Sequence, residues 1–532
     1  MSIASSETIS YRETGYFSSL ILDYLNQHSE IKNLYNRFPD IENFKHQIQE
    51  KQQSFSQNNR NILVQVLKNQ YQNLEIPLIV EENIKLLGKQ NTFTIVTGHQ
   101  LNLFTGPLYF LYKIISTINL CKELKNSYPD YHFIPIYWMA TEDHDFEEIN
   151  HFSFENKTIS WNKESTGPVG RLSTKGLEEV FKVFENTLGL GENADKLKEL
   201  FKKTYLEHNN LTDATRYLAN KLFQKEGLVI VDGDSKDLKE LFIPYVKKEL
   251  MEQVTFKNVS ETIKHFDNYG VQVNPRDVNL FYIEDTIRKR ISKANEKYKI
   301  IDSQIEFTKI EIFDLLEKHP EKFSPNVLLR PLYQEIILPN LCYIGGGGEI
   351  AYWLELKNSF KAFDIPFPML LLRNSVLLAS KKQNDKMQKL NLSWQDLFKK
   401  QQTLINEKTK DFSQFSLDFS EQKEFLKKQF ERLTYIASKT DKSFIGAVKA
   451  QETKQLKGLE NLEKRLLKAE KKVHTEKLDR IIHLQNKLFP NQSLQERKNN
   501  FSEFYKEYGN SFIERLLAEL EPLEQEFKVL VL

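Results

Sequence analysis

The sequence predicts an α/β fold, in which a parallel sheet is covered by helices on both faces and a long antiparallel helical domain is added. Three observations carry this prediction. Short, nearly all-apolar runs alternate with helical patterns between residues 93 and 380, as in strands buried on both faces of a parallel sheet. Residues 420–488 contain no proline and keep a helical periodicity. With 40% hydrophobic residues, the 532-residue chain can bury a sizeable core.

Residues 1–92 are predicted to form a helical segment that packs on this core. Apolar residues recur at helical spacing in residues 16–25, and Ile62, Leu63, Val66 and Leu67 repeat the same pattern. We expect no strand before Phe93.

Residues 93–380 form the predicted core. Its candidate strands are the runs 93–100, 132–145, 227–234, 279–283, 341–348 and 368–378. A helix from about 107 to 124 follows the first of them. Because ligands of parallel sheets bind at the carboxyl ends of the strands, we expect the functional site in the polar clusters that follow these runs.

Residues 381–488 are predicted to form a long helical hairpin or coiled coil, and residues 489–532 to return to the core. Heptad spacing is kept by Leu459, Leu462, Leu466, Ala469 and Val473. We expect residues 387–405 to supply the antiparallel partner helix, starting at a capping box of Ser393 and Asp396. Residues 420–488 hold 17 Lys or Arg against 10 Asp or Glu, which we interpret as a solvated helix face.

Composition excludes several classes of protein. A net charge of +1 does not favour binding to nucleic acid or to membranes. Cys121 and Cys342 are too far apart for a CxxC motif or a disulfide framework, which fits a reducing compartment. No apolar run approaches the roughly 18–20 residues of a membrane helix, and the polar N-terminus does not resemble a signal peptide. We expect a cytoplasmic protein without membrane or nucleic-acid partners.

The first candidate site follows the first strand. Gly98 permits a tight turn, and His99 and Gln100 would project into the site as donors. Thr105 stands just before a helix start at Pro107, where free backbone amides can hold a phosphate or carboxylate. An ordinary strand-to-helix turn, with a structural role for His99, is an equally open reading.

The second candidate site is a group of four ionisable residues directly after the second strand: Glu142, Asp143, His144 and Asp145. Packing does not explain this group, because buried carboxylates need partners. General acid–base catalysis, binding of an ammonium group and metal ligation are all compatible with it. No zinc template matches, so we assign no metal site here. A solvated loop is the less favoured alternative.

The third candidate site is a glycine loop at 345–348, which is neither a Walker A loop nor a GxGxxG fingerprint. Glycines allow a ligand to approach the backbone closely. The residues assigned to substrate binding here are Gly346, Gly347, Gly348, Glu349, Tyr352 and Trp353. Arg330 and Arg373 would need an anionic partner if buried, either a substrate or a structural carboxylate.

These segments together resemble one family. TGHQLNLFTGPLYFLYKIIS (97–116), PIYWMATEDHDFEEINH (135–151) and YIGGGGEIAYWLELK (343–357) look like signature blocks of the BshC family of bacillithiol biosynthesis, and two weaker blocks at 323–340 and 488–497 agree. Family members commonly have Gln where His99 stands, so we do not expect His99 to be an obligatory catalytic base.

The resemblance implies a Rossmann-like core with helical insertions, similar to class I nucleotidyl-transferring ligases, and a coiled coil associated with homodimers. It implies a ligase that adds cysteine to glucosaminyl-malate, with ATP or ADP as the associated nucleotide. The acidic cluster would then orient the amine and manage protons, and Arg330 or Arg373 would bind the malate carboxylates. Asn491, Gln495 and Arg497 are assigned to a separate nucleotide pocket.

Two alternatives remain open from the sequence. The chain could be another class I-like nucleotidyl-transferring or amino-acid-activating enzyme. It could also be a non-enzymatic coiled-coil scaffold whose α/β part only binds a ligand.

Overall fold

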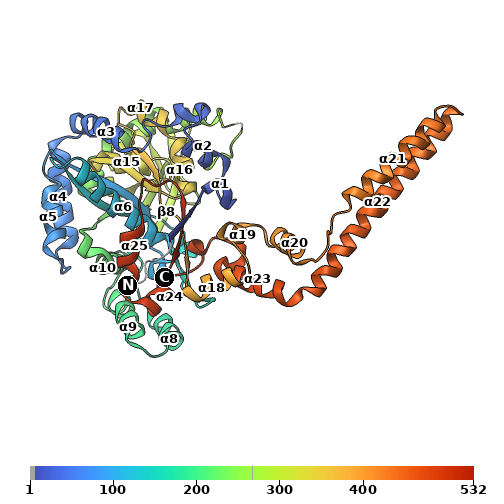
Figure 1. The fold of residues 1–532 in the computed structure, drawn as a ribbon. Coiled ribbons are helices and arrows are strands. Elements are labelled where there is room, and N and C mark those ends of the chain that lie inside the picture. Colours follow the sequence, from blue (N-terminus) through green and yellow to red (C-terminus); the bar gives the residue numbers. More distant parts are fainter. Residues whose placement is uncertain (1–5, 267) are drawn as a thin grey trace.

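The computed structural model describes residues 6–266 and 268–532, and its centre is a five-stranded, wholly parallel sheet (Figure 1). The strands are β2 (Thr92–His99), β3 (His132–Met139), β6 (Val229–Asp232), β12 (Asn340–Gly345) and β13 (Met369–Leu372). All residues of β2, β12 and β13 are buried, because helices cover both faces of the sheet. The prediction of a parallel α/β core is confirmed.

The sheet has the order β13-β12-β2-β3-β6. If the five strands are renumbered in chain order and read from β6, their order is 3-2-1-4-5, which is the strand order of Rossmann-like folds. The order reverses between β2 and β12, and a ligand crevice is expected outside the carboxyl ends of strands at such a switch point. Helix α6 (Tyr109–Ser127) links β2 to β3, and α16 (Gly347–Leu354) with α17 (Lys357–Ala362) links β12 to β13.

The N-terminal segment is mainly helical, but the expectation of no strand before Phe93 is wrong. Its α-helices are α1 (Tyr11–Thr14), α2 (Ser19–Leu25), α3 (Ile41–Ser54), α4 (Gln57–Tyr71) and α5 (Leu78–Leu86). Strand β1 (Ser6–Ile9) pairs antiparallel with β15 (Phe527–Val531), which pairs in parallel with β14 (Val376–Ala379). The short, polar β1 shows no strand periodicity, and its partner lies at the other end of the chain.

Two predicted core strands are placed differently by the structure. The run 279–283 forms β7 (Leu280–Glu284) in a second, antiparallel sheet of order β10-β9-β8-β7-β11. Its other strands are β8 (Ile287–Ala294), β9 (Lys297–Ile300), β10 (Glu306–Thr308) and β11 (Phe323–Pro325). The run 368–378 is interrupted at Arg373 and supplies both β13 and β14, which belong to different sheets. A short apolar run indicates that a strand is buried, but it does not indicate which sheet the strand joins.

Further elements are inserted between the central strands. Those between β3 and β6 are α7 (Phe146–Ile149), β4 (His151–Phe154), β5 (Lys157–Ser160), α8 (Leu177–Leu188), α9 (Glu192–Tyr205) and α10 (Leu211–Phe223). Those between β6 and β12, besides the second sheet, are α11 (Lys236–Glu240), α12 (Ile243–Glu252), α13 (Val254–Ile263), α14 (Lys309–Lys318) and α15 (Arg330–Ile337).

The coiled-coil domain projects from the core as an arm (Figure 1). The arm pairs α21 (Ser420–Ala437) with α22 (Lys442–Val473). The prediction that residues 387–405 form the antiparallel partner helix is wrong, because this stretch is divided among three short helices: α18 (Lys381–Lys389), α19 (Trp394–Phe398) and α20 (Gln401–Phe412). A short connection makes α21 the natural antiparallel neighbour of α22. The capping box of Ser393 and Asp396 is present at the start of α19.

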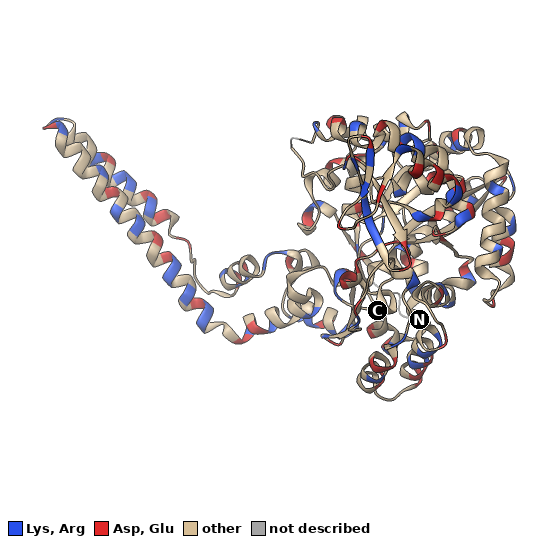
Figure 2. Ribbon diagram, turned by 180° about the vertical axis from the view of Figure 1, so that it is seen from behind, with Lys and Arg blue, Asp and Glu red and all other residues tan. Residues whose placement is uncertain are grey.

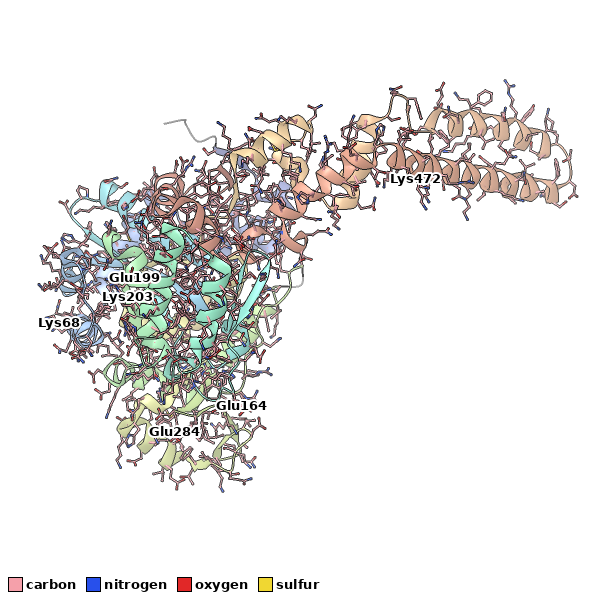
Figure 3. All side chains as sticks on the ribbon, turned by 90° about the horizontal axis from the view of Figure 1, so that it is seen from below. Lys68, Glu164, Glu199, Lys203, Glu284 and Lys472 are labelled. Atoms are coloured by element: carbon pink, nitrogen blue, oxygen red, sulfur yellow. The ribbon has the colours of Figure 1, made fainter. Side chains whose placement is uncertain are left out.

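The heptad residues of α22 do not all face α21. Leu459 and Leu466 are half-buried, whereas Ala469 is exposed and Leu462 and Val473 are 52% and 72% exposed. Charges of both signs are interspersed along the arm in Figure 2, and Figure 3 shows its side chains, Lys472 among them, standing clear of the core. None of the described helices combines the length and apolar character needed to cross a membrane.

The chain returns from the arm to the core. It passes through α23 (Thr475–Leu488), a 3₁₀ turn at Gln495–Arg497, α24 (Phe501–Tyr508) and α25 (Ser511–Glu519) before it enters β15.

Candidate functional site

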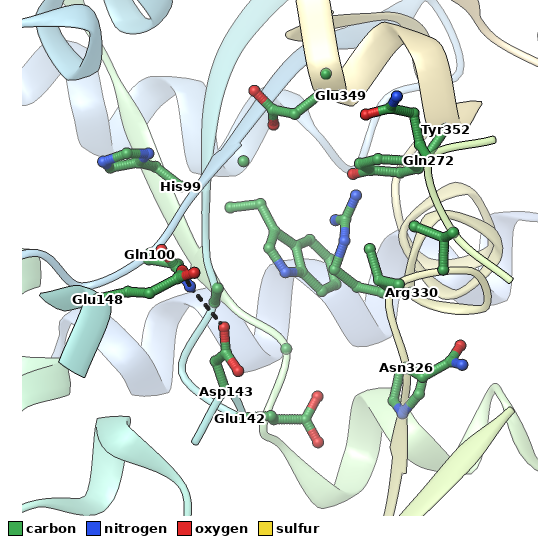
Figure 4. A pocket seen from close by; sticks show the side chains of 18 of the residues that line it. His99, Gln100, Glu142, Asp143, Glu148, Gln272, Asn326, Arg330, Glu349 and Tyr352 are labelled. Carbon is green, nitrogen blue, oxygen red and sulfur yellow. Dashed lines mark hydrogen bonds between the residues drawn. The ribbon is translucent and has the colours of Figure 1, made fainter. Parts of the chain in front are cut away.

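A cavity of about 990 Å³ opens at the carboxyl ends of β2, β3 and β12, beside the switch point of the sheet (Figure 4). The ends of these strands, the glycine loop and the inserted sheet all contribute to its wall. Small-molecule sites typically span roughly 300–1,000 Å³, so this cavity lies at the upper end of that range.

The cavity collects residues from all three predicted segments. The predicted residues that line it are Gly98, His99, Gln100, Glu142, Asp143, Arg330, Gly346, Gly347, Gly348, Glu349, Tyr352, Arg373 and Arg497. The predicted residues outside its lining are Thr105, His144, Asp145, Trp353, Asn491 and Gln495. The turn after each central strand therefore brings distant segments together, as the parallel topology requires.

Glu142 lies at the acidic end of the cavity in contact with a buried lysine. The Nζ atom of Lys239, on α11, lies 2.5 Å from Glu142 Oε1 and donates a 3.2 Å hydrogen bond to Asp234 Oδ1. Burial raises the pKa of Glu142, and the attraction of Lys239 does not cancel this effect. Glu142 is therefore the carboxyl of the pair 142–143 that accepts a proton more readily.

The neighbouring carboxylate of Asp143 is shifted in the opposite direction. Gln100 Nε2 donates to its Oδ2 at 2.8 Å, the His144 amide donates to its Oδ1 at 2.7 Å, and Arg288 Nη1 lies 3.7 Å away. Burial alone would raise the pKa of Asp143, but the His144 side chain, with Nδ1 3.6 Å from Oδ1, and these contacts hold it well below its usual range. When two adjacent carboxyls have opposite pKa shifts, one can transfer protons while the other stays ionised and stabilises a positive charge.

The remaining members of this cluster have local partners. Gln100 Nε2 also donates to Glu148 Oε2 at 2.8 Å, so one amide joins two carboxylates. The half-exposed His144 ring lies with Nδ1 2.7 Å from Arg288 Nη1. Asp145 is the N-cap of α7 and accepts from the Glu148 amide at 3.4 Å. Within the described ranges, no three His, Cys, Asp or Glu side chains are grouped to hold a metal ion.

Glu349 organises the glycine loop at the opposite end. It accepts from the Gly346 amide at 2.9 Å and from Tyr343 Oη at 2.6 Å, and it forms an ion pair with Lys113. Burial would raise the pKa of Glu349, but Lys113 and these donors lower it. Trp353 lies outside the cavity and stacks on the Tyr343 ring at 4.6 Å.

Lys113 ties this end of the cavity to the first strand. The buried Nζ atom donates to Gly98 O at 2.8 Å. Burial lowers the pKa of Lys113 even though Glu349 opposes the shift. Lys113 was not predicted, although a visible signal existed, because it is the only charged residue between Leu108 and Cys121.

Two arginines at this end have buried donors without a hydrogen-bond partner among the described residues. Arg330 Nη1 donates to Gln334 Oε1 at 3.0 Å, while its Nη2 is buried and unpaired. Arg373 forms a two-pronged ion pair with Glu496, at 2.7 and 3.1 Å, while its Nε is buried and unpaired. Unsatisfied buried donors are rare in folded proteins, so these two atoms are available to a ligand or to water in the cavity.

His99 is buried beside this cationic group, packed edge-on against Tyr109 with ring centroids 5.4 Å apart. Burial, Lys113 and Arg373 together hold the pKa of His99 well below its usual value. The imidazole is therefore neutral at physiological pH, and its buried Nε2 has no partner among the described residues.

The helix start predicted near Thr105 is not a free anion site. Helix α6 begins at Tyr109, and the Leu108 amide already donates to Asn499 O at 2.9 Å. Phe104 and Thr105 have left-handed backbones, with φ of 48° and 70°. Asn500 Nδ2 clamps this turn by donating to Phe104 O at 2.8 Å and to Gly106 O at 2.6 Å.

The three residues assigned to a nucleotide pocket have separate surroundings. Gln495 exchanges two 2.9 Å hydrogen bonds with the backbone of Leu378. Asn491 occupies a left-handed position, with φ of 55°, in a 3₁₀ turn. Of the three, Arg497 alone lines the cavity.

Residues 268–279 cross the rim of the cavity between α13 and β7. Gln272, Val273, Asn274 and Arg276 from this segment line the cavity. Glu355, which is buried at the end of α16, holds the segment by accepting from the Gln272 amide at 2.7 Å. Burial raises the pKa of Glu355 to about 7.

Two family models match this chain along nearly its whole length. "Bacillithiol biosynthesis BshC, N-terminal Rossmann-like domain" matches residues 4–374, and "Bacillithiol biosynthesis BshC, C-terminal coiled-coil domain" matches residues 376–532.

Curated relatives match over similar lengths. One from Flavobacterium psychrophilum is 62% identical over 98% of this chain and 99% of its own. One from Flavobacterium johnsoniae is 61% identical over 99% of each chain. One from Bacillus cereus is 28% identical over 94% of this chain and 95% of its own. All three bear the name "Putative cysteine ligase BshC".

Proposed function

The chain belongs to the BshC family of bacillithiol biosynthesis, and from this premise we propose that it is a ligase that joins cysteine to the amino group of glucosaminyl-malate. One observation supports this proposal most directly: Glu142 and Asp143 lie together in one part of the cavity, whereas the unpaired atoms Arg330 Nη2 and Arg373 Nε lie in another part, beside Gly98 and the glycine loop. An acceptor with an amino group and two carboxylates matches that polarity.

The acidic end has the properties needed to prepare the attacking amine. An ammonium group must lose a proton before its nitrogen can form an amide bond. Glu142, whose pKa burial raises, would accept that proton, while the ionised Asp143 would hold the ammonium group in place. Gln100 fixes Asp143 in position for this role.

The cationic end has the properties needed to hold the malate carboxylates. The buried Arg330 Nη2 and Arg373 Nε would each complete their hydrogen bonding on a carboxylate oxygen. The neutral His99 adds a further polar contact, and the paired Glu349 adds no unbalanced negative charge.

We include ATP as the co-substrate of this reaction. The cysteine carboxyl must exchange a C–O bond for the new C–N bond, and a carboxylate oxygen is a poor leaving group. Transfer of a phosphoryl or adenylyl group from ATP to that oxygen makes it part of a good leaving group. When the amine attacks the carbonyl carbon, the oxygen then leaves as part of phosphate or AMP.

A homodimer through the arm belongs to the same proposal. Leu462 and Val473 are exposed on one side of α22, and α21 does not cover them. A second arm packed there would bury this apolar stripe. Light scattering over a range of concentrations tests the dimer, and a monomer at every concentration would exclude it.

The proposal is tested by mass-spectrometric detection of the amide formed from cysteine, glucosaminyl-malate and ATP. Asp143→Asn should lower the rate by about 100-fold. Asp145→Asn is the matched control, because Asp145 lies outside the cavity. Equal rates for wild type and Asp143→Asn would refute the assigned site, and faster reaction with another amino acid would refute cysteine as the substrate.

A further inference from the structure

A second group of arginines lines the cavity from the inserted antiparallel sheet. Arg288 and Arg290 are two residues apart on β8, so their side chains project from the same face. Phe281 of β7 pairs directly opposite Arg290, and Arg276 lies just before β7 in the rim segment. The inserted sheet and the rim segment before it thus add three positive charges to a cavity that already contains Arg330.

Arg288 is fully engaged by the protein. Its guanidinium lies 4.0 Å from the centre of the Phe281 ring. Its Nη1 faces Asp143 and His144, its Nη2 donates to Pro325 O at 3.3 Å, and its Nε donates to Ser324 Oγ at 3.4 Å. Arg288 therefore joins the inserted sheet to the acidic cluster and has little capacity left for a ligand.

Arg276 and Arg290 are not engaged in this way. In residues 6–266 and 268–532, neither side chain takes part in an ion pair or hydrogen bond, and the Nε atom of Arg290 is buried without a partner. An arginine keeps its charge at any physiological pH, so each carries a positive charge that no carboxylate among the described residues pairs with.

The carboxylates that line the cavity do not pair with these two arginines and are held by other side chains. Glu142 contacts Lys239, Asp143 and Glu148 both accept from Gln100, and Glu349 contacts Lys113. Both guanidinium groups are therefore available to bind an anionic ligand that enters the cavity.

We propose that Arg276 and Arg290 form a subsite for the phosphate groups of a nucleoside triphosphate. Two guanidinium groups on neighbouring segments suit a chain of several charged groups better than a single carboxylate. Arg276 is exposed and Arg290 is half-buried, and both line the cavity, so the phosphates can enter from solvent. The subsite rests on the proposed nucleotide dependence of the ligase, and it places the nucleotide in the central cavity, away from Asn491 and Gln495.

The position of this subsite agrees with the chemistry of the proposed reaction. Arg288 connects β8 to Asp143 across 3.7 Å, so the phosphates would lie on the same side of the cavity as the acidic cluster. The amine and the activating nucleotide would then approach the cysteine carboxyl from adjoining walls.

The test is ATP binding to the full chain, measured by isothermal titration calorimetry without cysteine or acceptor. The double variant Arg276→Ala/Arg290→Ala should weaken ATP binding by at least about tenfold. Inorganic triphosphate should compete with ATP for the wild type and far less for the double variant. Arg432→Ala, on the exposed side of the arm, is the matched control and should bind ATP like the wild type. Circular dichroism of each variant tests whether it is folded.

Several results would overturn the subsite. Undetectable ATP binding by the wild type would do so, as would wild-type affinity in the double variant. Loss of ATP binding in Arg497→Ala alone would place the phosphates near the C-terminal segment instead. Weaker binding of L-malate but unchanged binding of ATP in the double variant would assign the two arginines to carboxylates.

The outcome also separates the subsite from the ligase function on which it rests. Arginine-dependent ATP binding without any amide product would leave the subsite standing and refute the ligase. ATP-dependent ligation with equal activity and ATP affinity in the double variant would refute the subsite alone.

Discussion

Arg373 at the end of β13 and Glu496 in the returning C-terminal segment form a buried, two-pronged ion pair, with nitrogen–oxygen distances of 2.7 and 3.1 Å. Glu496 also accepts from the Val376 amide at 3.2 Å. One carboxylate thus fixes both Arg373 in the cavity wall and the short break between β13 and β14.

Removal of Glu496 should leave a buried, uncompensated arginine. Glu496→Ala is therefore expected to lower the free energy of unfolding by about 3–5 kcal/mol, measured by urea denaturation. The control is Glu476→Ala, which breaks an exposed ion pair with Arg480 and should change stability by less than about 1 kcal/mol. Similar losses in both variants would contradict the role of burial.

Lys113 and Glu349 should behave as a coupled pair. Lys113→Met leaves the partly buried Glu349 carboxylate without its cation. Because this side chain is not fully buried, the cost should lie at the low end of the range for buried pairs, about 3 kcal/mol of stability. The double variant Lys113→Met/Glu349→Gln should recover part of that loss, because it removes both charges. A double-mutant cycle from thermal or urea unfolding measures the coupling, and strictly additive losses would show that the pair does not interact.

The pH dependence of the proposed reaction should report Glu142. Only the deprotonated carboxyl can accept a proton, so kcat/KM should rise as the pH increases through the raised pKa of Glu142. Glu142→Gln should lower kcat by about 100-fold and abolish this acidic limb. Asp143→Asn should retain the limb, because the pKa of Asp143 is already far below the working range. An unchanged acidic limb in Glu142→Gln would assign the base to another group.

Glu355 should make stability fall as the pH rises. Its folded pKa of about 7 exceeds the ordinary value of 4.5, so its contribution to stability is full below 4.5 and is lost as the pH rises through about 7. Glu355→Gln keeps an acceptor for the Gln272 amide but cannot ionise. The variant should therefore gain stability relative to wild type above about pH 7, as measured by urea unfolding across pH. Parallel stability curves would refute this prediction.

Asn500 should act as a positioning residue for the segment that carries His99 and Gln100. Asn500→Ala removes two hydrogen bonds from a turn with consecutive left-handed residues, Phe104 and Thr105. We expect kcat of the proposed reaction to fall by about tenfold or more, with a smaller change in KM. Asn500→Asp keeps the oxygen that accepts from the Ser502 amide, so it should restore part of the kcat only if that hydrogen bond matters. Equal kcat values for wild type, Asn500→Ala and Asn500→Asp would exclude a positioning role for Asn500.

The sequence predicted the central sheet because burial on both faces leaves a readable pattern of apolar runs. It also predicted that the residues after β2, β3 and β12 meet, because parallel strands direct their carboxyl ends to one edge. Gly98, Asp143 and Glu349 therefore line one cavity although they come from distant segments.

The partners of these residues could not be predicted in the same way. Lys239 and Arg288 belong to insertions whose position relative to the sheet has no local sequence signal. Glu496 reaches Arg373 through a chain that first leaves the core along the arm and then returns. Long-range pairing of this kind depends on tertiary packing and not on periodicity.

The returning C-terminal segment also determines when the molecule can be completed during synthesis. The two family models divide the chain near residue 375, yet Arg373 lacks its counter-ion until Glu496 has been made, and β1 lacks its partner until β15 follows. The Rossmann-like part therefore emerges from the ribosome with a buried charge unpaired and a sheet edge open. Its final folding must wait for the arm, so the first 374 residues are not expected to form a stable protein when expressed alone.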